Sequence, residues 1–327
     1  MIPPRRHTFR LLAAAALAAL LTPAVAADAY PAKPIKYIVP FAPGGVSDAI
    51  ARLLGQQLAE RLGQPVLVDN RPGVSGIVGT QATARSAPDG YTIMGGTITT
   101  HAVNVYFNKN LGYDQVRDFV PVSLVGTVSN VLVVPANSRF HTVADIVAAL
   151  KAQPDSLTYG TSGAGTSQHL SGQLFQSQTA TRMRQIPYKG GAGAMTDLIG
   201  GQLDMVFETV AAARPMIDGK RVRALAVTAK ARLPALPDVP ALAELGLPGF
   251  EMQSWQGVFA PAGTPPAVVE RLSRELAAIV RQPDVQATMR NLGVEPVGSS
   301  AATFADFQRS EIDKWGKVIR GAGITAE

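Results

Sequence analysis

Residues 35–48 read IKYIVPFAPGGVSD and pass from one kind of structure into another. The run Ile35 to Val39 is short, β-branched and bounded by prolines, which is typical of a strand. Two glycines follow, and beyond them apolar residues recur at helical spacing. The segment therefore predicts a strand, a glycine loop and a helix, and the apolar face of that helix consists of Ile50, Leu53, Leu54, Leu58 and Leu62.

The next elements continue this alternation of strand and helix. Val66 to Val68 predicts a second strand, and Ile77 to Ala84 has helical character. Pro88-Asp89-Gly90 marks a turn before a further strand at Tyr91 to Met94. Strands that alternate with helices pair in parallel and carry the helices on the faces of the sheet. The first half of the chain is therefore predicted to be α/β.

A second copy of the same order begins near Asn130. Leu157 to Gly160 predicts a strand, which leads through the glycine loop TSGAGTS at 161–167 into a helix at Gln168 to Gln178. The order of strand, glycine loop and helix thus occurs once in each half. The other predicted elements are strands at 131–134, 183–187, 203–207, 222–227 and 255–260, helices at 143–150 (with Thr142 and Asp145 as a capping box) and 265–280, and a surface connection at 233–248.

The first 26 residues resemble a secretory signal peptide. Arg5, Arg6 and Arg10 precede an uninterrupted Leu/Ala run from Leu11 to Leu21, and Ala24-Val25-Ala26 has the small-x-small pattern of a cleavage site. The run is about half the ~20 apolar residues of a membrane-spanning helix, which disfavours the alternative of an N-terminal anchor. We expect cleavage after Ala26, export by the general or the twin-arginine route, and no lipid anchor because no cysteine is present.

Composition excludes several classes of function. The formal net charge of +6 includes the three arginines of the predicted signal peptide, so the mature chain carries +3. It contains no basic cluster of the kind that binds nucleic acid. With no cysteine, the protein has no disulfide, no thiolate nucleophile and no cysteine-bound zinc. The sequence also contains no cluster of His, Asp and Glu residues that would suggest a metal site without cysteine.

The two glycine loops are the main candidate site. Ligands of open parallel sheets bind beyond the carboxyl ends of the strands, where first-turn N–H groups and the helix dipole favour an anion. Ser47, Ser162, Thr166 and Ser167 add hydroxyl donors. Six charge-assisted hydrogen bonds contribute a gross ~9–18 kcal/mol, whereas micromolar affinity needs about 8 kcal/mol net. A carboxylate therefore needs no Arg or Lys in the loops, although the glycines and serines also suit ordinary turns and caps.

Four single residues have two interpretations each. Asp48 is either a helix cap or a direct partner for an amine or hydroxyl of the ligand. His169 follows the second loop and either packs against the loop and orients it or contacts the ligand. Phe207 and Trp255 stand at predicted strand ends, where they belong either to the core or to the wall of a cleft, and a core position is the more common one for aromatic residues.

Catalytic motifs are absent from the sequence. The stretch Gly160-Thr161-Ser162-Gly163-Ala164 departs from the nucleophile elbow Gly-x-Ser-x-Gly at its last position. Neither a Walker loop nor a complete dinucleotide-binding fingerprint occurs. We therefore expect a binding protein that is not an enzyme and has no cofactor.

An ordered set of motifs resembles the Bug receptors, the extracytoplasmic solute-binding proteins of tripartite tricarboxylate transporters. The motifs are PFAPGG (40–45) with Ser47-Asp48, NRPG (70–73), PDGY (88–91), GTSGAG (160–165) with His169-Leu170, PYKG (187–190) and GQLDM (201–205). The resemblance implies a two-lobed periplasmic binding protein fold of type II, in which each lobe is a mainly parallel sheet flanked by helices. A small carboxylated solute would then bind in the cleft between the lobes.

The resemblance also implies the division of the chain and the site. Lobe 1 is expected at residues 27–128 and 253–327, lobe 2 at 129–252, and the crossings near Ser129 and Gln253. Ile77 and Glu208-Thr209 depart from common family residues, so the resemblance does not identify one solute. The expected ligand-binding residues are Phe41, Ala42, Pro43, Gly44, Gly45, Ser47, Asp48, Ser75, Gly76, Thr161, Ser162, Gly163, Gly165, Thr166, Ser167, His169, Phe207 and Glu208.

These observations predict a monomeric periplasmic receptor that captures an organic, amino or aromatic acid and passes it to a membrane permease. Two alternatives remain open at this level. One is a periplasmic enzyme that uses Asp48 or His169 as acid or base, and the other is a sensory module that presents its closed form to a membrane kinase.

Overall fold

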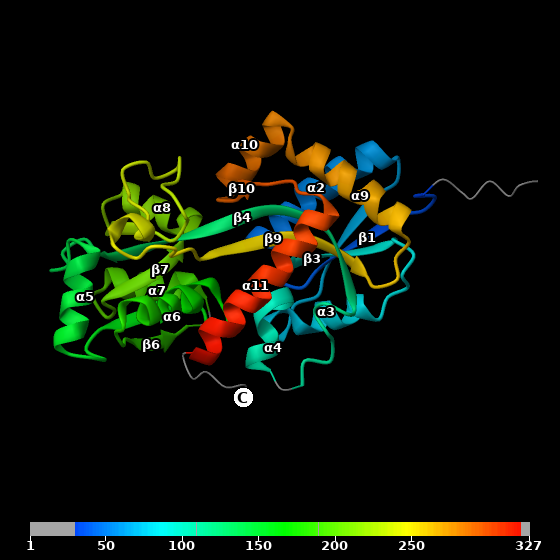
Figure 1. Cartoon of the computed structure of the whole chain (residues 1–327). Coiled ribbons are helices and arrows are strands. Elements are labelled where there is room, and N and C mark those ends of the chain that lie inside the picture. The colour runs from blue at the N-terminus through cyan, green and yellow to red at the C-terminus, as the bar shows by residue number, and fades with distance from the viewer. Residues whose placement is uncertain (1–29, 109, 189, 322–327) are drawn as a thin grey trace, which may run out of the picture.

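The computed structural model describes residues 30–108, 110–188 and 190–321 (Figure 1). The predicted signal peptide lies outside these ranges. Ten strands form one curled sheet, in the order β2-β1-β3-β9-β4-β7-β5-β6, and β8 and β10 both pair with β4. Within the described ranges, no helix combines the length and the apolar character needed to span a bilayer.

The two ends of this sheet are parallel. We call the part built on β1, β2 and β3 lobe 1, and the part built on β5, β6, β7 and β8 lobe 2. In lobe 1, β1 pairs in parallel with β2 and β3, and in lobe 2, β5 pairs in parallel with β6 and β7. The strand bounds are β1 Ile35–Val39, β2 Val66–Asn70, β3 Thr92–Thr97, β5 Thr158–Thr161, β6 Arg184–Pro187, β7 Met205–Thr209 and β8 Val222–Val227.

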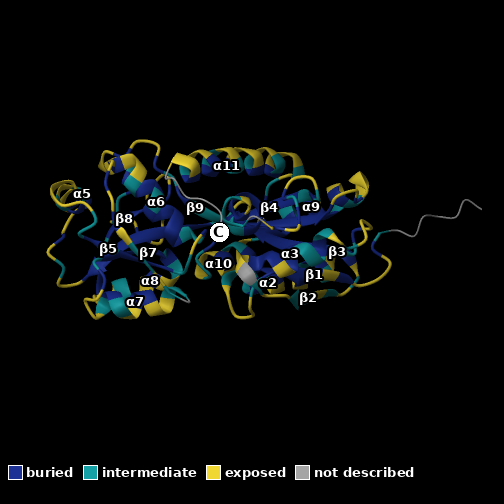
Figure 2. Cartoon of the chain, turned by 90° about the horizontal axis from the view of Figure 1, so that it is seen from below, coloured by how far each residue is buried: buried dark blue, intermediate teal, exposed yellow. Residues whose placement is uncertain are grey.

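A glycine loop and a helix follow the first strand of each parallel group, as predicted. Helix α2 follows β1, and helix α6 follows β5. The capping box predicted at Thr142 is present at the start of α5. Figure 2 shows that the strands in the middle of the sheet are mostly buried and that the helices expose their outer faces, whereas the edge strands β2 and β6 are only partly buried. The helices of the two parallel groups are α2 Val46–Leu62, α3 Ile77–Ala84, α5 Val143–Ala152, α6 Ser167–Thr179, α7 Gly191–Ile199 and α8 Val210–Asp218.

Two long strands join the lobes. β4 (Phe119–Pro135) pairs in antiparallel fashion with β9 (Gln253–Pro261) as far as Ser129, and from Asn130 onward it pairs with β7 and β8. The prediction of a strand at 131–134 was therefore much too short. Pro121 interrupts the pattern because it cannot donate a hydrogen bond, and the register of β4 against β9 shifts at this position.

The chain after β9 covers lobe 1 and reaches lobe 2. Helices α9 (Pro266–Val280) and α10 (Pro283–Asn291) lead to β10 (Glu295–Pro296), which pairs with β4 at Thr127. Helix α11 (Ala301–Gly321) then packs along β4 and reaches α6 of lobe 2 (Figure 1).

The segment 233–248 is more than the surface connection that its prolines suggest. Leu236, Ala241 and Leu242 are buried, and a short 3₁₀ helix, η3, spans Leu242–Leu245. The N–H group of Val227 in β8 donates to the carbonyl of Pro240. Prolines end regular helices and strands, but the apolar side chains between them still pack against the sheet.

Candidate functional site

The first glycine loop is held in shape by Asp48. This side chain is buried, and its Oδ2 accepts the N–H of Gly44 at 2.9 Å and the Nε–H of Arg52 at 3.1 Å. Helix α2 begins after Gly45, which is the N-cap residue and receives no side-chain cap. Of the two interpretations of Asp48, a simple N-cap does not apply, because Asp48 lies inside the first turn and bonds the loop before it.

Asn70 at the end of β2 completes this arrangement. Its Nδ2 donates to the carbonyl of Phe41 at 3.1 Å and to Oδ1 of Asp48 at 3.0 Å, while Arg52 donates to its Oδ1 at 3.2 Å. Burial raises the pKa of Asp48, but the hydrogen bonds from Arg52, Gly44 and Asn70 outweigh burial and keep this pKa below its ordinary value. Asp48 is thus an ionised carboxylate fully engaged in holding the loop.

The second glycine loop has a comparable internal support. Gly163 and Gly165 have φ angles of +107° and +72°, which side chains other than glycine rarely adopt. Thr166 is the N-cap of α6, and its hydroxyl donates to the carbonyl of Gly163 at 2.7 Å. The Thr161 hydroxyl oxygen accepts the N–H of Gly163 at 3.3 Å. Two hydroxyl groups therefore fix the path of this loop.

His169 orients the second loop from below. The ring is buried, and Nδ1 accepts the N–H of Gly165 at 3.1 Å. Burial lowers the pKa of His169 to about 4, so the ring is neutral at pH 7 and Nδ1 is free to accept this hydrogen bond. Of the two interpretations of this residue, the structure supports the one in which His169 packs against the loop and orients it.

Both loops present polar groups at helix starts. The N–H groups of Val46, Ser47 and Asp48 have no acceptor within their own helix, as is general for a first turn. The same holds at the start of α6, around Ser167. Ser47 donates its hydroxyl to Oε1 of Gln256 at 2.9 Å. These groups form a donor-rich surface in each lobe and include no lysine or arginine from either loop.

Ser75 and Gly76 lie beside the first loop. Ser75 is exposed with a φ of 53°, and its carbonyl accepts Nδ2 of Asn104 at 3.1 Å. A Cβ at Gly76 would lie 3.4 Å from the ring of Phe41. The 3₁₀ turn η1 (Val74–Gly76) thus places an exposed hydroxyl next to the first loop. Of the remaining loop residues, Ala42, Pro43, Gly44 and Gly45 are exposed, and Ser162 is partly exposed.

Phe207 and Glu208, two of the expected ligand-binding residues, are both buried. Phe207 is fully buried and packs against Phe175 with ring centroids 5.8 Å apart, so its side chain belongs to the core. Trp255 is also fully buried. Glu208 is buried as well; its Oε1 accepts the N–H of Thr209 at 2.7 Å and Nε2 of Gln168 at 3.2 Å. Phe207 was predicted from its place at a strand end, and that position alone does not indicate which way a side chain points.

The buried position of Glu208 has an electrostatic consequence. Burial raises its pKa, and the hydrogen bonds from Thr209 and Gln168 only partly oppose this change. Among the described residues, its Oε2 has no hydrogen-bond partner. A Cβ at Gly191 would lie 2.2 Å from this oxygen, so the glycine at the start of α7 leaves room for it. Glu208 therefore bonds Gln168 in the first turn of α6, after the second loop, and lies beside the starts of α7 and α8.

Sequence reasoning missed the polar residues of the crossing strands. The Oδ1 of Asn130 accepts the hydroxyl of Ser167 at 3.3 Å, and its Nδ2 donates to Ser171 at 3.1 Å. Gln256 on β9 accepts the hydroxyl of Ser47, within lobe 1. The sequence contained one signal, because Asn130 stands directly before the apolar run 131–134. In the structure this polar residue is completely buried.

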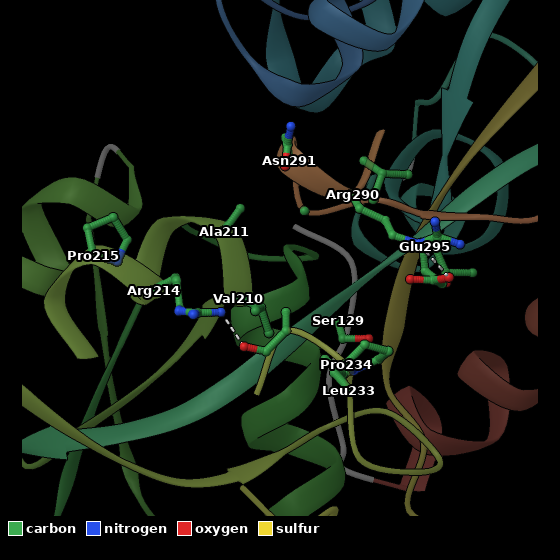
Figure 3. A pocket seen from close by; sticks show the side chains of 14 residues that line it. Ser129, Val210, Ala211, Arg214, Pro215, Leu233, Pro234, Arg290, Asn291 and Glu295 are labelled. Atoms are coloured by element: carbon green, nitrogen blue, oxygen red, sulfur yellow. Dashed lines mark hydrogen bonds and ion pairs between the residues drawn. The ribbon is translucent and has the colours of Figure 1, made fainter. Parts of the chain in front are cut away.

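A cavity of about 540 Å³ lies beside β4, between α8 and α10, and is bordered by both lobes (Figure 3). Its charged groups are already paired: Arg214 bonds Asp218 and the carbonyl of Ala235, and Arg290 bonds Glu295. The glycine loops therefore offer more donors to an anion than this cavity does. The lining residues are Thr127, Ser129, Val210, Ala211, Arg214, Pro215, Leu233, Pro234, Ala235, Arg290, Asn291, Gly293, Val294 and Glu295.

Two α/β lobes joined by crossing strands, each with a glycine loop at a helix start, define the class of two-lobed periplasmic binding proteins. The solved structure of the periplasmic binding protein BugD has this architecture. It matches with a TM-score of 0.77 and 32% identity over 91% of this chain and 100% of that one. The chain belongs to the tripartite tricarboxylate transporter family receptors, and the sequence model of this family matches residues 50–324.

Individual relatives agree with this assignment. A UPF0065 protein encoded in the tcbD-tcbE intergenic region of Pseudomonas sp. strain P51 is 43% identical over 95% of this chain and 93% of its own length. The protein BugT of Bordetella pertussis is 38% identical over 91% of this chain and 92% of its own. The Bug resemblance inferred from the motifs is thereby confirmed.

Two further solved structures contain small acids. An R. palustris protein with adipate has a TM-score of 0.81 and 36% identity, covering 91% of this chain and 100% of that one. MatC from Rhodopseudomonas palustris with bound malate has a TM-score of 0.76 and 30% identity, covering 89% and 100%. This chain is therefore a member of a family of periplasmic ligand-binding receptors.

Proposed function

We propose that this receptor captures a small organic carboxylate between its lobes and delivers it to the permease of a tripartite tricarboxylate transporter. The observation that carries the proposal is the pair of helix starts, one in each lobe, whose glycine loops offer N–H and hydroxyl groups and contain no lysine or arginine. Such groups bind a carboxylate through N–H and O–H donors. Adipate and malate in the two R. palustris neighbours support the choice of a carboxylate.

The same proposal includes the division and the location of the chain. Lobe 1 comprises residues 27–128 and 253–327, lobe 2 comprises 129–252, and the mature monomer begins after a cleaved signal peptide. The change of partners along β4 between Ser129 and Asn130, and the pairing of Ser129 with Gln253, support these boundaries. Hinge motion at the crossing strands closes the lobes on the solute.

The arrangement argues against acid–base chemistry by the two residues that an enzyme would use. Asp48 is ionised and bonded to Gly44, Arg52 and Asn70, so its oxygens already have partners. The Nδ1 of His169 accepts a backbone N–H group, and the ring is buried. A general base must reach the proton that it removes, and neither group faces an open surface.

The test begins with native mass spectrometry of gently purified mature protein, to detect a small acid that travels with it. A thermal-shift screen of mono- and dicarboxylates follows, because ligand at 100 times its dissociation constant stabilises a protein by ~2.7 kcal/mol. We expect at least one carboxylate to raise the melting temperature and to be recovered unchanged after long incubation. No shift with any carboxylate contradicts the proposal, and turnover of the acid supports the enzyme alternative.

Two variants localise the site. Ser47→Ala and Ser167→Ala each remove one hydroxyl at a helix start, and each should weaken binding of the carboxylate about 5- to 10-fold. Ser310→Ala removes an exposed hydroxyl of α11 and serves as the matched control. If binding is insensitive to both loop variants, the solute binds elsewhere, and the cavity beside α8 and α10 becomes the next candidate.

A further inference from the structure

Phe107 of lobe 1 lies against the second glycine loop of lobe 2. A Cβ at Gly165 would lie 3.2 Å from Cδ2 of Phe107, so the ring is packed onto the loop backbone. The centroid of the same ring lies 5.8 Å from that of His169. Nearby, the hydroxyl of Thr99 donates to the carbonyl of Gly165 at 3.4 Å. One residue of the loop is thus contacted from the opposite lobe on two sides.

The support of Phe107 belongs to lobe 1. Its short helix α4 (Asn104–Phe107) follows the π-helical turn η2 (Thr99–Val103), which comes directly after β3. Asn104 donates to the carbonyl of Ser75, and the hydroxyl of Tyr106 donates to the carbonyl of Ile312 in α11. These bonds tie α4 both to the turn beside the first loop and to the C-terminal helix.

Gly165 itself is held by lobe 2. Its N–H group donates to Nδ1 of His169, and its φ of +72° favours glycine. The contact with Phe107 therefore joins two firmly supported parts, one from each lobe, next to both ligand loops. Because Phe107 and Gly165 belong to different lobes, separation of the lobes must break this contact.

We propose that Phe107 is a positioning residue that holds the lobes closed over the glycine loops and thereby slows the release of bound solute. The inference rests on the proposed function of solute capture. A residue that stabilises only the closed form lowers the apparent dissociation constant in proportion to the closed population that it adds. It does so without touching the ligand, so its effect falls mainly on the dissociation rate.

The first test compares Phe107→Ala with Val105→Ala. Val105 is on the same helix and is 45% exposed, so it is a matched control away from the loop. With adipate and malate as probes, Phe107→Ala should raise the dissociation rate about tenfold, as for loss of one partly buried aromatic contact. Val105→Ala should leave it unchanged. Equal dissociation rates in Phe107→Ala and Val105→Ala overturn the proposal.

The second test needs no ligand. The chain has no cysteine, so Gln56→Cys on α2 and Ala152→Cys on α5 introduce two spin labels at exposed positions, one in each lobe. Pulsed electron resonance then measures the distribution of distances between them. Phe107→Ala should broaden this distribution toward longer distances, and an unchanged distribution overturns the proposal.

The two tests separate this inference from the proposed function. If neither acid binds the wild type but Phe107→Ala opens the lobes, the choice of ligand is wrong and the role of Phe107 stands. If both acids bind and neither rate nor distance changes, the role of Phe107 is wrong and solute capture stands. Phe107→Leu keeps much of the apolar volume and should give an intermediate result, including in the case that Phe107→Ala does not fold.

Discussion

At the scale of single residues, each glycine loop is held by one buried titratable side chain. Asp48 is a charged acceptor in lobe 1, and His169 is a neutral acceptor in lobe 2. Both accept the N–H group of a glycine four residues earlier in the chain. The two lobes thus use different chemistry for the same geometric task, which is to turn a loop so that its helix start stays accessible.

The sequence indicated both residues but could not decide their roles. Asp48 and His169 were found because they follow glycine-rich loops, which is a local pattern. Asn70 bonds Asp48 across 22 positions and Gln256 bonds Ser47 across 209, and such pairings depend on the tertiary fold. For that reason the positions of the loops were predictable, whereas the hydrogen bonds that shape them were not.

Replacement of Asp48 should destabilise the protein more than replacement of its partner. Asp48→Ala leaves the N–H of Gly44 without its acceptor and the amide of Asn70 with only the carbonyl of Phe41, so we expect a loss of about 1–3 kcal/mol in the free energy of unfolding. Arg52 is largely exposed, so Arg52→Ala should destabilise the protein much less than Asp48→Ala does. Urea denaturation measures both values. Equal losses would mean that the ion pair, rather than the buried carboxylate, holds the loop.

His169 should make stability fall in mild acid. Its pKa is about 4 in the folded protein, below the ordinary 6.5, so the unfolded chain takes up the proton first. Its contribution is complete above pH 6.5 and is lost as the pH falls from 6.5 toward 4. His169→Asn keeps an acceptor near the loop and cannot titrate, so its unfolding free energy should fall less over this range. His141→Asn, at an exposed position, is the control.

Buried His101 acts in the same direction and is a second source of acid sensitivity. Burial lowers its pKa to about 3, and its ring stacks on Phe259 at 3.8 Å. The comparison of His169→Asn with the wild type therefore isolates one histidine, because His101 is present in both proteins. Identical pH profiles would show that the bond from Gly165 to His169 adds nothing to stability.

At the scale of elements, α2 and β1 were predicted nearly to the residue, because a clear period ends at Gly63 and at Pro40, and the bounds of α3 were predicted although Arg85 follows that helix. β4 was not, since polar residues on the strand, such as Ser123, Thr127 and Ser129, break the apolar pattern where it crosses between the lobes. The segment 233–248 shows the opposite effect, in which prolines concealed a packed segment. The local sequence pattern therefore predicted an element best when the whole element lies within one lobe.

The packing of α11 onto β9 depends on Gly257. A Cβ at this position would lie 2.1 Å from Cζ of the buried Phe304 in α11, so Gly257→Ala forces the helix away from the strand. We expect a loss of about 1–3 kcal/mol in the free energy of unfolding, as for other overpacked cores. Gly200→Ala, whose added carbon meets its nearest atom at 3.5 Å, should change stability little. Comparable losses in the two variants would contradict this account of the packing.

At the scale of the whole molecule, export predicts a defined N-terminus for the mature protein. If residues 1–26 are a signal peptide, the mature protein recovered from the periplasm begins at Ala27, and intact-mass measurement checks this directly. Replacement of Leu17 by Arg breaks the apolar run and should retain the full-length chain in the cytoplasm. A full-length chain in the periplasm would instead support an uncleaved N-terminal segment.

The long strand β4 also bears on the order in which the protein folds. Lobe 2 is formed by one continuous stretch of chain, whereas the sheet of lobe 1 is complete only when β9 pairs with both β3 and β4. Pairing across such sequence separations is slow, because a large loop must close first. We therefore expect lobe 2 to fold early and lobe 1 to close last, around a strand that already has neighbours in lobe 2. A chain that crosses a membrane unfolded, N-terminus first, would acquire its structure in this order.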